Sequence, residues 1–175
     1  MSCPDLSELV ALFYESRERL ARFEAVEELP ADYARLLDHD QHMTVTVEQY
    51  HGGPVNLRVL EERARPPHYA RKILLERRSD GRVVQFGIMR IDLAQLPPTV
   101  RQEIEARGEP LGRILIRHNV WREVQLDALW QVTPGIELTE IFGDDRPTYG
   151  RTALIYCNGA PAVELLEIVA PCDAP

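Results

Sequence analysis

The last third of the chain contains a predicted β-hairpin whose returning strand is apolar except for two acids. The first strand is expected over residues 151–157, the turn over 157–161 (Cys-Asn-Gly-Ala-Pro) and the second strand over 162–169. Glu164 and Glu167 lie in that second strand. Desolvating an unpaired carboxylate is strongly unfavourable. The fold must therefore offer these acids a partner, and such acids are candidates for chemistry or for binding a polar ligand.

Composition narrows the class of protein. The 175 residues fit one domain, and the net charge of -8 argues against a nucleic-acid partner. We find neither a signal-peptide pattern nor an apolar window approaching the ~20 residues of a membrane span, so no membrane partner is expected. The three cysteines, Cys3, Cys157 and Cys172, are widely spaced, which indicates reduced thiols in a cytoplasmic protein.

The order of predicted elements indicates an α+β fold. Helices are predicted over residues 5–26, 30–37 and 96–107, with a short helix or turn after Leu111-Gly112. Strands are predicted over residues 43–49, 55–60, 69–77, 82–91, 123–132, 151–157 and 162–169. Repeated hairpins favour an antiparallel sheet with helices packed on it. We expect a single domain over residues 1–175, with N-terminal helices in residues 1–35.

Arg71 is a candidate binding residue. In a strand over 69–77 it shares one face with Tyr69, Ile73 and Leu75, whereas Lys72 points to the other face. An arginine on an apolar face needs an anionic partner, and its planar fork matches a carboxylate. That partner is either a ligand or an internal acid such as Glu167.

Glu167 and Glu164 must point in opposite directions, because an odd separation along a strand places two residues on opposite faces. Glu167 shares its face with Val163, Leu165 and Val169. A solvated acid on an edge strand is the ordinary alternative for either residue.

Several short motifs, taken in order, resemble the chorismate pyruvate-lyase (4-hydroxybenzoate synthase) superfamily, in particular its compact bacterial and archaeal branch. The resemblance covers residues 36–171. It rests on Leu36-Leu37, His42-Met43-Thr44, Arg71-Lys72-Ile73-Leu74-Leu75, Pro110-Leu111-Gly112-Arg113, Tyr149-Gly150-Arg151 and Glu167-Ile168-Val169-Ala170-Pro171. It implies a single six-stranded antiparallel sheet with flanking helices, and a ligand buried under two helix-turn flaps. The ligand-binding domain of one class of bacterial transcription repressors shares this fold.

The resemblance also implies roles for individual residues. Arg71 would hold the ring carboxylate together with the amides around Leu111 and Gly112, and Met43 would belong to a flap. Glu167 would contact the hydroxyl para to the carboxylate, with Glu164 as the alternative acid. An ordinary turn at Pro110-Leu111-Gly112 and core packing of Met43 are the competing readings.

The expected function is then that of an enzyme, a carbon–oxygen lyase. It would convert chorismate to 4-hydroxybenzoate and pyruvate without a cofactor, for quinone or phenolic precursor biosynthesis, with Arg71 and Glu167 as catalytic residues. A monomer or a dimer is possible. One alternative is a non-catalytic sensor of small aromatic acids with the same fold, although residues 1–35 look too short for a DNA-binding domain. The other is a lyase acting on a related cyclohexadiene carboxylate.

Two histidines and three arginines are further candidate ligands. His39 and His42 are three residues apart and could share a helix face, but no third ligand completes a known metal-binding spacing, so no metal is expected. Arg113, Arg117 and Arg151 could be second anion contacts or ordinary surface residues.

Overall fold

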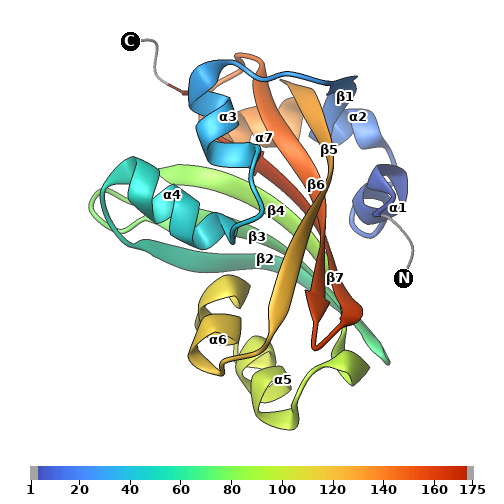
Figure 1. Ribbon diagram of the computed structural model, residues 1–175. Helices are drawn as coiled ribbons and strands as arrows, with labels where there is room; N and C mark the ends of the chain where they lie inside the picture. The colour runs from blue at the N-terminus through green and yellow to red at the C-terminus, as the bar shows by residue number, and fades with distance from the viewer. Residues whose placement is uncertain (1–3, 173–175) are drawn as a thin grey trace.

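The computed structural model describes residues 4–172, and its strands form one seven-stranded sheet (Figure 1). All neighbouring strands are antiparallel, in the order β1-β5-β6-β7-β4-β3-β2. The strands are β1 (Ala21–Val26), β2 (Val55–Arg65), β3 (His68–Arg77), β4 (Val83–Asp92), β5 (Arg122–Pro134), β6 (Thr148–Cys157) and β7 (Ala160–Val169). The predicted α+β class with an antiparallel sheet is confirmed, whereas the expected count of six strands is corrected to seven.

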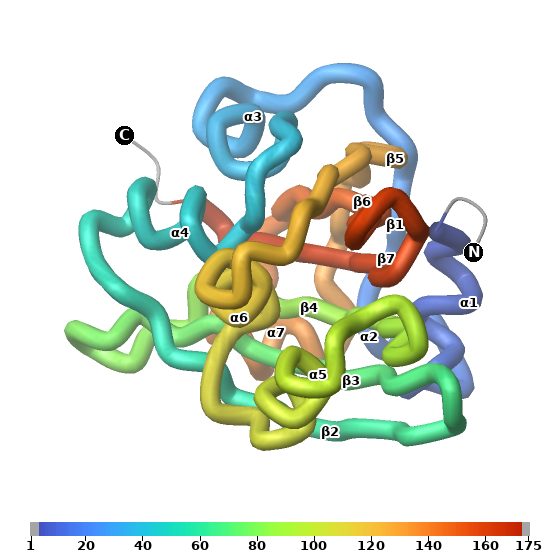
Figure 2. The backbone as a smooth tube through the Cα atoms, turned by 60° about the horizontal axis from the view of Figure 1, so that its bottom comes forward, coloured from blue at the N-terminus to red at the C-terminus, as the bar shows by residue number. Residues whose placement is uncertain are grey.

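Helices cover both faces of the sheet. The α-helices are α1 (Leu6–Ala11), α2 (Arg17–Leu20), α3 (Ala31–Leu37), α4 (Met43–His51), α5 (Pro98–Glu105), α6 (Leu111–Arg117) and α7 (Ile136–Phe142), and a 3-10 turn, η1, spans Leu93–Gln95. Buried side chains of α3, α4, α5 and α6 belong to one apolar core, and those of α1, α2 and α7 to a second core on the other side. We call the face under α3–α6 the inner face. Figure 2 shows α5 and α6 next to each other beside the β2–β3 end of the sheet.

The predicted helix over residues 5–26 is wrong in its second half. The chain forms α1, restarts as the one-turn helix α2 after Ser16, and then enters β1. All six residues of β1 pair with β5, and Phe23 packs edge-to-face on Trp130 at 6.4 Å between ring centroids. Pairing with a distant strand decides the structure of this short segment, and local spacing cannot report it.

The predicted strand over residues 43–49 is also wrong, because this segment is helix α4. Its buried residues are Met43, Thr44, Thr46 and Val47, a spacing that suits one face of a helix lying on the sheet. Gly52, in the left-handed region with φ of 67°, ends the helix. The Thr-Val-Thr-Val alternation resembles a half-buried strand. Both of its threonines, Thr44 and Thr46, are buried together with Met43 and Val47, which is the pattern of a helix face.

The remaining predicted elements occur with different ends. Strands β2, β5, β6 and β7 are longer than expected, and the break at Pro66-Pro67 is the turn of the β2–β3 hairpin, where the Pro66-Pro67 peptide bond is cis. The last hairpin turns at Asn158-Gly159, both with positive φ. Helix α7 was not predicted.

Alternate residues of β3 point to opposite faces of the sheet, as the period of two predicts. Tyr69, Ile73 and Leu75 contribute to the inner-face core, whereas Leu74 belongs to the opposite core. Lys72 points to that opposite side, where its Nζ lies 3.0 Å from Glu137 Oε1 and 4.7 Å from the ring centre of Tyr14. Arg71 is therefore on the inner face.

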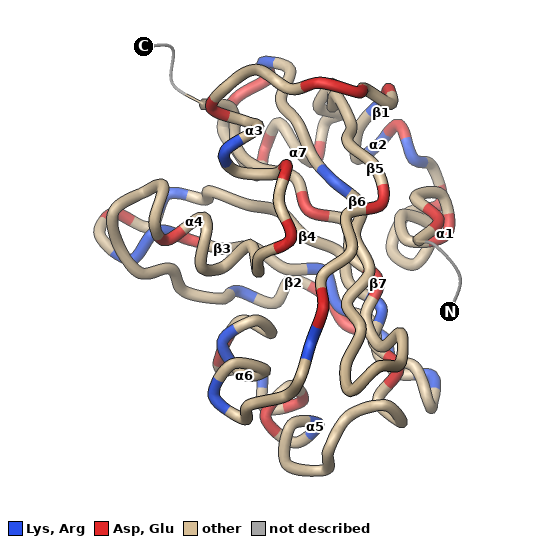
Figure 3. The backbone as a smooth tube through the Cα atoms, viewed as in Figure 1, with Lys and Arg blue, Asp and Glu red and all other residues tan. Residues whose placement is uncertain are grey.

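Charged residues of both signs are interspersed along the chain (Figure 3). Within residues 4–172, no helix is long and apolar enough to cross a membrane.

Candidate functional site

A small internal cavity lies between the inner face of the sheet and the N-terminal ends of α4 and α6. Its volume is about 30 Å³, room for no more than a few water molecules. All five predicted site residues line it. The full lining is His42, Met43, Thr44, Leu57, Arg71, Ile73, Leu75, Gln85, Met89, Pro110, Leu111, Gly112, Val124, Arg151, Ile155, Leu165 and Glu167.

Strand register arranges the polar residues of the cavity floor in three rows. Arg71 of β3 lies opposite Met89 of β4 in the first row. In the second row, Gly87 of β4 lies opposite Glu167 of β7, which in turn lies opposite Arg151 of β6. In the third row, Gln85 lies between Leu75 and Val169. Consecutive rows are two residues, roughly 7 Å, apart along the strands.

Arg71 is fully buried and forms no salt bridge with any residue of the described range 4–172. Its Nε lies 3.2 Å from Met89 Sδ, its Nη1 lies 3.5 Å from the carbonyl oxygen of Ile104, and its Nη2 has no hydrogen-bond partner there. Burial lowers the pKa of Arg71 below its ordinary value. A buried guanidinium that lines a cavity and has a nitrogen without a hydrogen-bond partner is a candidate site for an anion.

Glu167 pairs with Arg151, so the alternative in which Glu167 neutralises Arg71 is excluded. Arg151 Nε donates to Glu167 Oε2 at 2.8 Å, and the two residues face each other across β6 and β7. Gly150 allows this close strand approach, since a Cβ atom there would lie 2.7 Å from the carbonyl oxygen of Glu167. Charge within this pair is balanced. The acid next to Arg71 is Glu62, opposite it on β2, whose carboxylate is engaged by Tyr69 and Arg107 and forms no salt bridge with Arg71.

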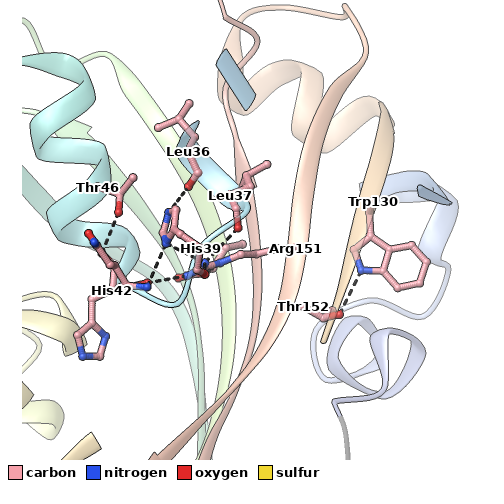
Figure 4. A network of polar contacts seen from close by, with 10 residues as sticks. Leu36, Leu37, His39, His42, Thr46, Trp130, Arg151 and Thr152 are labelled. Carbon is pink, nitrogen blue, oxygen red and sulfur yellow. Dashed lines mark hydrogen bonds and ion pairs between the residues drawn. The ribbon is translucent and has the colours of Figure 1, made fainter. Parts of the chain in front are cut away.

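Arg151 also holds the segment between α3 and α4 (Figure 4). Its Nη1 donates to the carbonyl oxygens of Leu37 at 3.2 Å and His39 at 2.8 Å, and its Nη2 donates to that of Gln41 at 3.1 Å. Arg151 is thus a buried structural arginine, neither a surface residue nor a free second anion contact. Through it, Glu167 is connected to the segment that leads into Met43.

Glu164 points away from the cavity. Arg90, directly opposite on β4, donates to it from Nε at 2.5 Å and from Nη2 at 3.0 Å. Arg90 Nη2 also reaches Glu8 of α1 at 3.1 Å. Glu164 therefore belongs to an ion pair on the opposite face, and Glu167 is the acid on the cavity side.

Met43, Leu111 and Gly112 form the wall above the floor. Gly112 fits closely against His42, because a Cβ atom at Gly112 would lie 3.0 Å from the His42 Cβ atom. This absence of a side chain lets the start of α6 contact the start of α4. Both covering segments therefore meet at His42.

His42 separates the internal cavity from a wider outer groove of about 680 Å³. His42 and Val124 line both spaces, and the exposed Trp121 lines the groove. Arg122 Nε donates to His42 Nε2 at 2.6 Å, which requires a neutral ring. Burial, with Arg122 and Arg151 nearby, lowers the pKa of His42 to about 4.

Gln85 is a cavity residue that sequence reasoning missed. It is 2% exposed, and its Oε1 has no hydrogen-bond partner among residues 4–172. The only sequence feature that could have pointed to Gln85 is that it is the single polar side chain in the run Val83 to Met89.

The remaining candidates have other partners. Arg113 pairs with Glu48, and Arg117 pairs with Glu103 and Glu109. His39 Nε2 donates to the carbonyl oxygen of Leu36, and its Nδ1 accepts from Gln41 N–H.

No set of metal ligands is found in the part of the chain that the structure describes. Among residues 4–172 there is no group of three or more His, Cys, Asp or Glu side chains that could hold a metal ion. His39 and His42 share no helix face, because α3 ends at Leu37 and α4 begins at Met43. Cys157 and Cys172 are free thiols, and Cys3 lies outside the described residues.

Comparison with known proteins finds the same fold in two solved structures. No protein-family model and no curated protein sequence matches the chain. The crystal structure of the effector domain of PhnF from Mycobacterium smegmatis is similar with a TM-score of 0.55 at 13% identity, over 74% of this chain and 88% of that one. The crystal structure of PhnF from the same organism is similar with a TM-score of 0.56 at 14% identity, over 97% and 89% of the two chains. At such identities the similarity establishes the fold.

These comparisons correct the expected function. The two similar structures are PhnF and its effector domain. The expectation of an enzyme, a chorismate pyruvate-lyase, is therefore wrong. The finding favours the non-catalytic alternative.

Proposed function

We propose that this chain is a non-catalytic binding domain for a small organic acid, with Arg71 as the residue that pairs with the acid group. The observation that carries the proposal is the unpartnered Nη2 of the fully buried Arg71 at the cavity. A buried charge without a counter-ion destabilises a fold. A bound carboxylate would satisfy both terminal nitrogens of the guanidinium at once.

Apolar and sulfur-containing side chains around Arg71 favour an acid that carries an apolar ring. Met43, Met89 and Leu111 line the cavity beside it, and methionine adapts its shape to flat rings. Glu167, held by Arg151, would contact a polar substituent on that ring. Gly112 allows the start of α6 to pack directly against His42 above the ring. The family resemblance of the sequence supports an aromatic acid such as 4-hydroxybenzoate as a first probe.

The covering segments must move for such a ligand to enter. A cavity of roughly 150 Å³ is needed for a benzene-sized ring, whereas the closed cavity measures about 30 Å³. His42 lies between the cavity and the outer groove, so displacing its side chain would join the two spaces. The starts of α4 and α6 would then act as a lid, and ligand binding would be coupled to their position. Such coupling is what a sensor requires.

A thermal-shift comparison of a matched acid and amide tests the proposal. Benzoate and 4-hydroxybenzoate should raise the melting temperature, because a ligand that binds the native state and not the unfolded chain stabilises the native state. Benzamide and 4-hydroxybenzamide have the same ring without the negative charge and should raise it much less. Equal shifts for acid and amide would contradict the role of Arg71.

A further inference from the structure

A row of apolar side chains crosses the inner face of the sheet, from Arg71 of β3 toward the outer groove. Each of the next four strands in the sheet contributes one residue to it, and all four residues line the cavity. We call them the apolar track: Met89 of β4, Leu165 of β7, Ile155 of β6 and Val124 of β5.

Strand register makes the apolar track continuous. Met89 lies directly opposite both Arg71 and Leu165. Ile155 lies opposite Val163, two residues from Leu165, so Ile155 and Leu165 are diagonal neighbours. Val124 lies directly opposite Ile155. Successive members of the track are therefore close enough for one ligand to contact them in turn.

The apolar track is longer than an acid with a single ring. Arg71 and Val124 are separated by four strand spacings, about 19 Å along the sheet. One ring next to a carboxylate held by Arg71 would cover Met89 and Leu165. Ile155 and Val124 would remain without a ligand contact.

The far end of the apolar track lies where the internal cavity meets the outer groove. Val124 and His42 line both spaces. The groove has a volume of about 680 Å³, against about 30 Å³ for the closed cavity. Once the His42 side chain is displaced, a ligand too long for the cavity has space to continue into the groove.

Exposed apolar side chains line this groove. Ile116 is 40% exposed and Trp121 is 63% exposed, and both lie in the groove. They are two of the four large hydrophobic side chains that are exposed within residues 4–172. Apolar surface gathered in a groove is typical of a binding site. The charged residues of the groove have both signs, namely Asp40, Arg122 and Glu123, so the groove as a whole does not select one charge.

We infer that the ligand is an acid with an extended apolar tail, which runs along the apolar track and ends in the outer groove against Ile116 and Trp121. The inference rests on the proposed function, because it assumes that Arg71 holds the acid group. The continuity of the track with the groove favours a tail of the same ligand over a separate partner. Burial of the tail would supply affinity that a one-ring acid lacks.

Titration calorimetry on the full chain with three 4-alkoxybenzoates tests the inference. The probes are 4-methoxybenzoate, 4-butoxybenzoate and 4-octyloxybenzoate, which share one acid group and one ring and differ only in the length of the tail. The wild type should bind the octyloxy acid at least about tenfold more tightly than the methoxy acid, with the butoxy acid between them.

Substitutions in the groove locate the tail. Ile116→Ser and Trp121→Ser should each reduce the gain of the octyloxy acid to about threefold or less, and should leave the affinity for the methoxy acid unchanged. Ile136→Ser is the matched control, because Ile136 is 75% exposed but lies on α7, which packs on the opposite face of the sheet. This variant should keep the full gain.

Tryptophan fluorescence gives a second readout of the tail. The chain has two tryptophans, and Trp130 packs at the core of the opposite face. Trp130→Phe therefore leaves Trp121 as the single emitting tryptophan. The octyloxy acid should shift its emission to shorter wavelength, because the indole would leave water, whereas the methoxy acid should leave the emission unchanged.

The outcomes separate this inference from the proposed function. Equal affinity of the wild type for the three acids would overturn the inference and leave the proposed function intact, as would a full gain in both Ile116→Ser and Trp121→Ser. Wild-type affinity of Arg71→Met for the octyloxy acid would show that the tail binds without the acid group, which contradicts both. If the wild type binds none of the three acids, both are overturned.

Discussion

Arg151 and Glu167 form a buried ion pair across β6 and β7, with Nε of the arginine 2.8 Å from Oε2 of the acid. The same guanidinium binds three backbone carbonyl oxygens between Leu37 and Gln41. One side chain thus fixes both the acid of the cavity floor and the segment that leads to the cavity wall. Removing it should affect stability first.

We predict that Arg151→Met lowers the free energy of unfolding by about 3–5 kcal/mol, the usual effect of removing one partner of a buried pair. Glu167 would be left buried without its counter-ion. The double variant Arg151→Met/Glu167→Leu should recover part of that loss. Urea denaturation of the wild type, the two single variants and the double variant measures the coupling. Strictly additive effects would contradict the pairing.

His42 should make stability depend on pH. Its pKa is lowered to about 4 in the folded protein by burial and by nearby arginines, against an ordinary value of 6.5. The unfolded chain therefore binds more protons between pH 6.5 and 4, so the His42 contribution is full above pH 6.5 and is lost as pH falls toward 4. The loss is on the order of 3 kcal/mol. Protonation would also remove the ring nitrogen that accepts from Arg122.

Urea unfolding at pH 4.5 and pH 7 measures this effect. His42→Gln keeps a polar side chain without titration in this range, so the difference between the two pH values should shrink. The pKa of His39 is lowered as well, mainly by burial, and contributes with the same sign. His39→Gln is thus the control that separates the two rings. An unchanged pH dependence in His42→Gln would refute the assignment.

Gly150 should tolerate no side chain. A Cβ atom there would lie 2.7 Å from the backbone carbonyl oxygen of Glu167, which cannot move without disturbing the β6–β7 ladder. Gly150→Ala should therefore destabilise the protein by about 1–3 kcal/mol. Gly108→Ala is the control, since no atom lies within 4 Å of a Cβ atom at that position. Similar melting temperatures for the two variants would show that the strand contact is looser than described.

A non-catalytic domain should leave chorismate intact. Incubating the purified protein with chorismate and analysing the mixture by chromatography should show no pyruvate or 4-hydroxybenzoate above the uncatalysed background. Release of both products at catalytic rates would reverse the correction and restore the lyase interpretation.

The sequence was most informative where alternation and turns are local. The hairpins of residues 55–91 and 148–169 follow from period-two patterns, and the same period separates Glu167 from Glu164. Prediction from the sequence failed where pairing with a distant strand determines the local structure, because β1 forms by pairing with β5. It also failed at α4, where Thr44 and Thr46 are buried against the sheet in a helix.

For the candidate site, sequence motifs selected five residues that line one cavity. Their order along the chain says nothing about pairing, however. That Glu167 pairs with Arg151 and not with Arg71 depends on strand order across β6, β7, β4 and β3. Gln85 was missed because a single glutamine in a strand is a weak signal until its burial and missing partner are known.

Arg71→Met tests the central claim most directly. The control is Arg58→Met, which replaces a half-exposed arginine of β2 that is paired with Glu76. By titration calorimetry with 4-hydroxybenzoate, Arg71→Met should weaken binding at least about 30-fold, the effect of losing a charge-assisted contact of roughly 2 kcal/mol. Without ligand it should melt at or above the wild-type temperature, because a buried unpaired charge is removed. A folded Arg71→Met variant that binds the acid as tightly as the wild type would contradict the account.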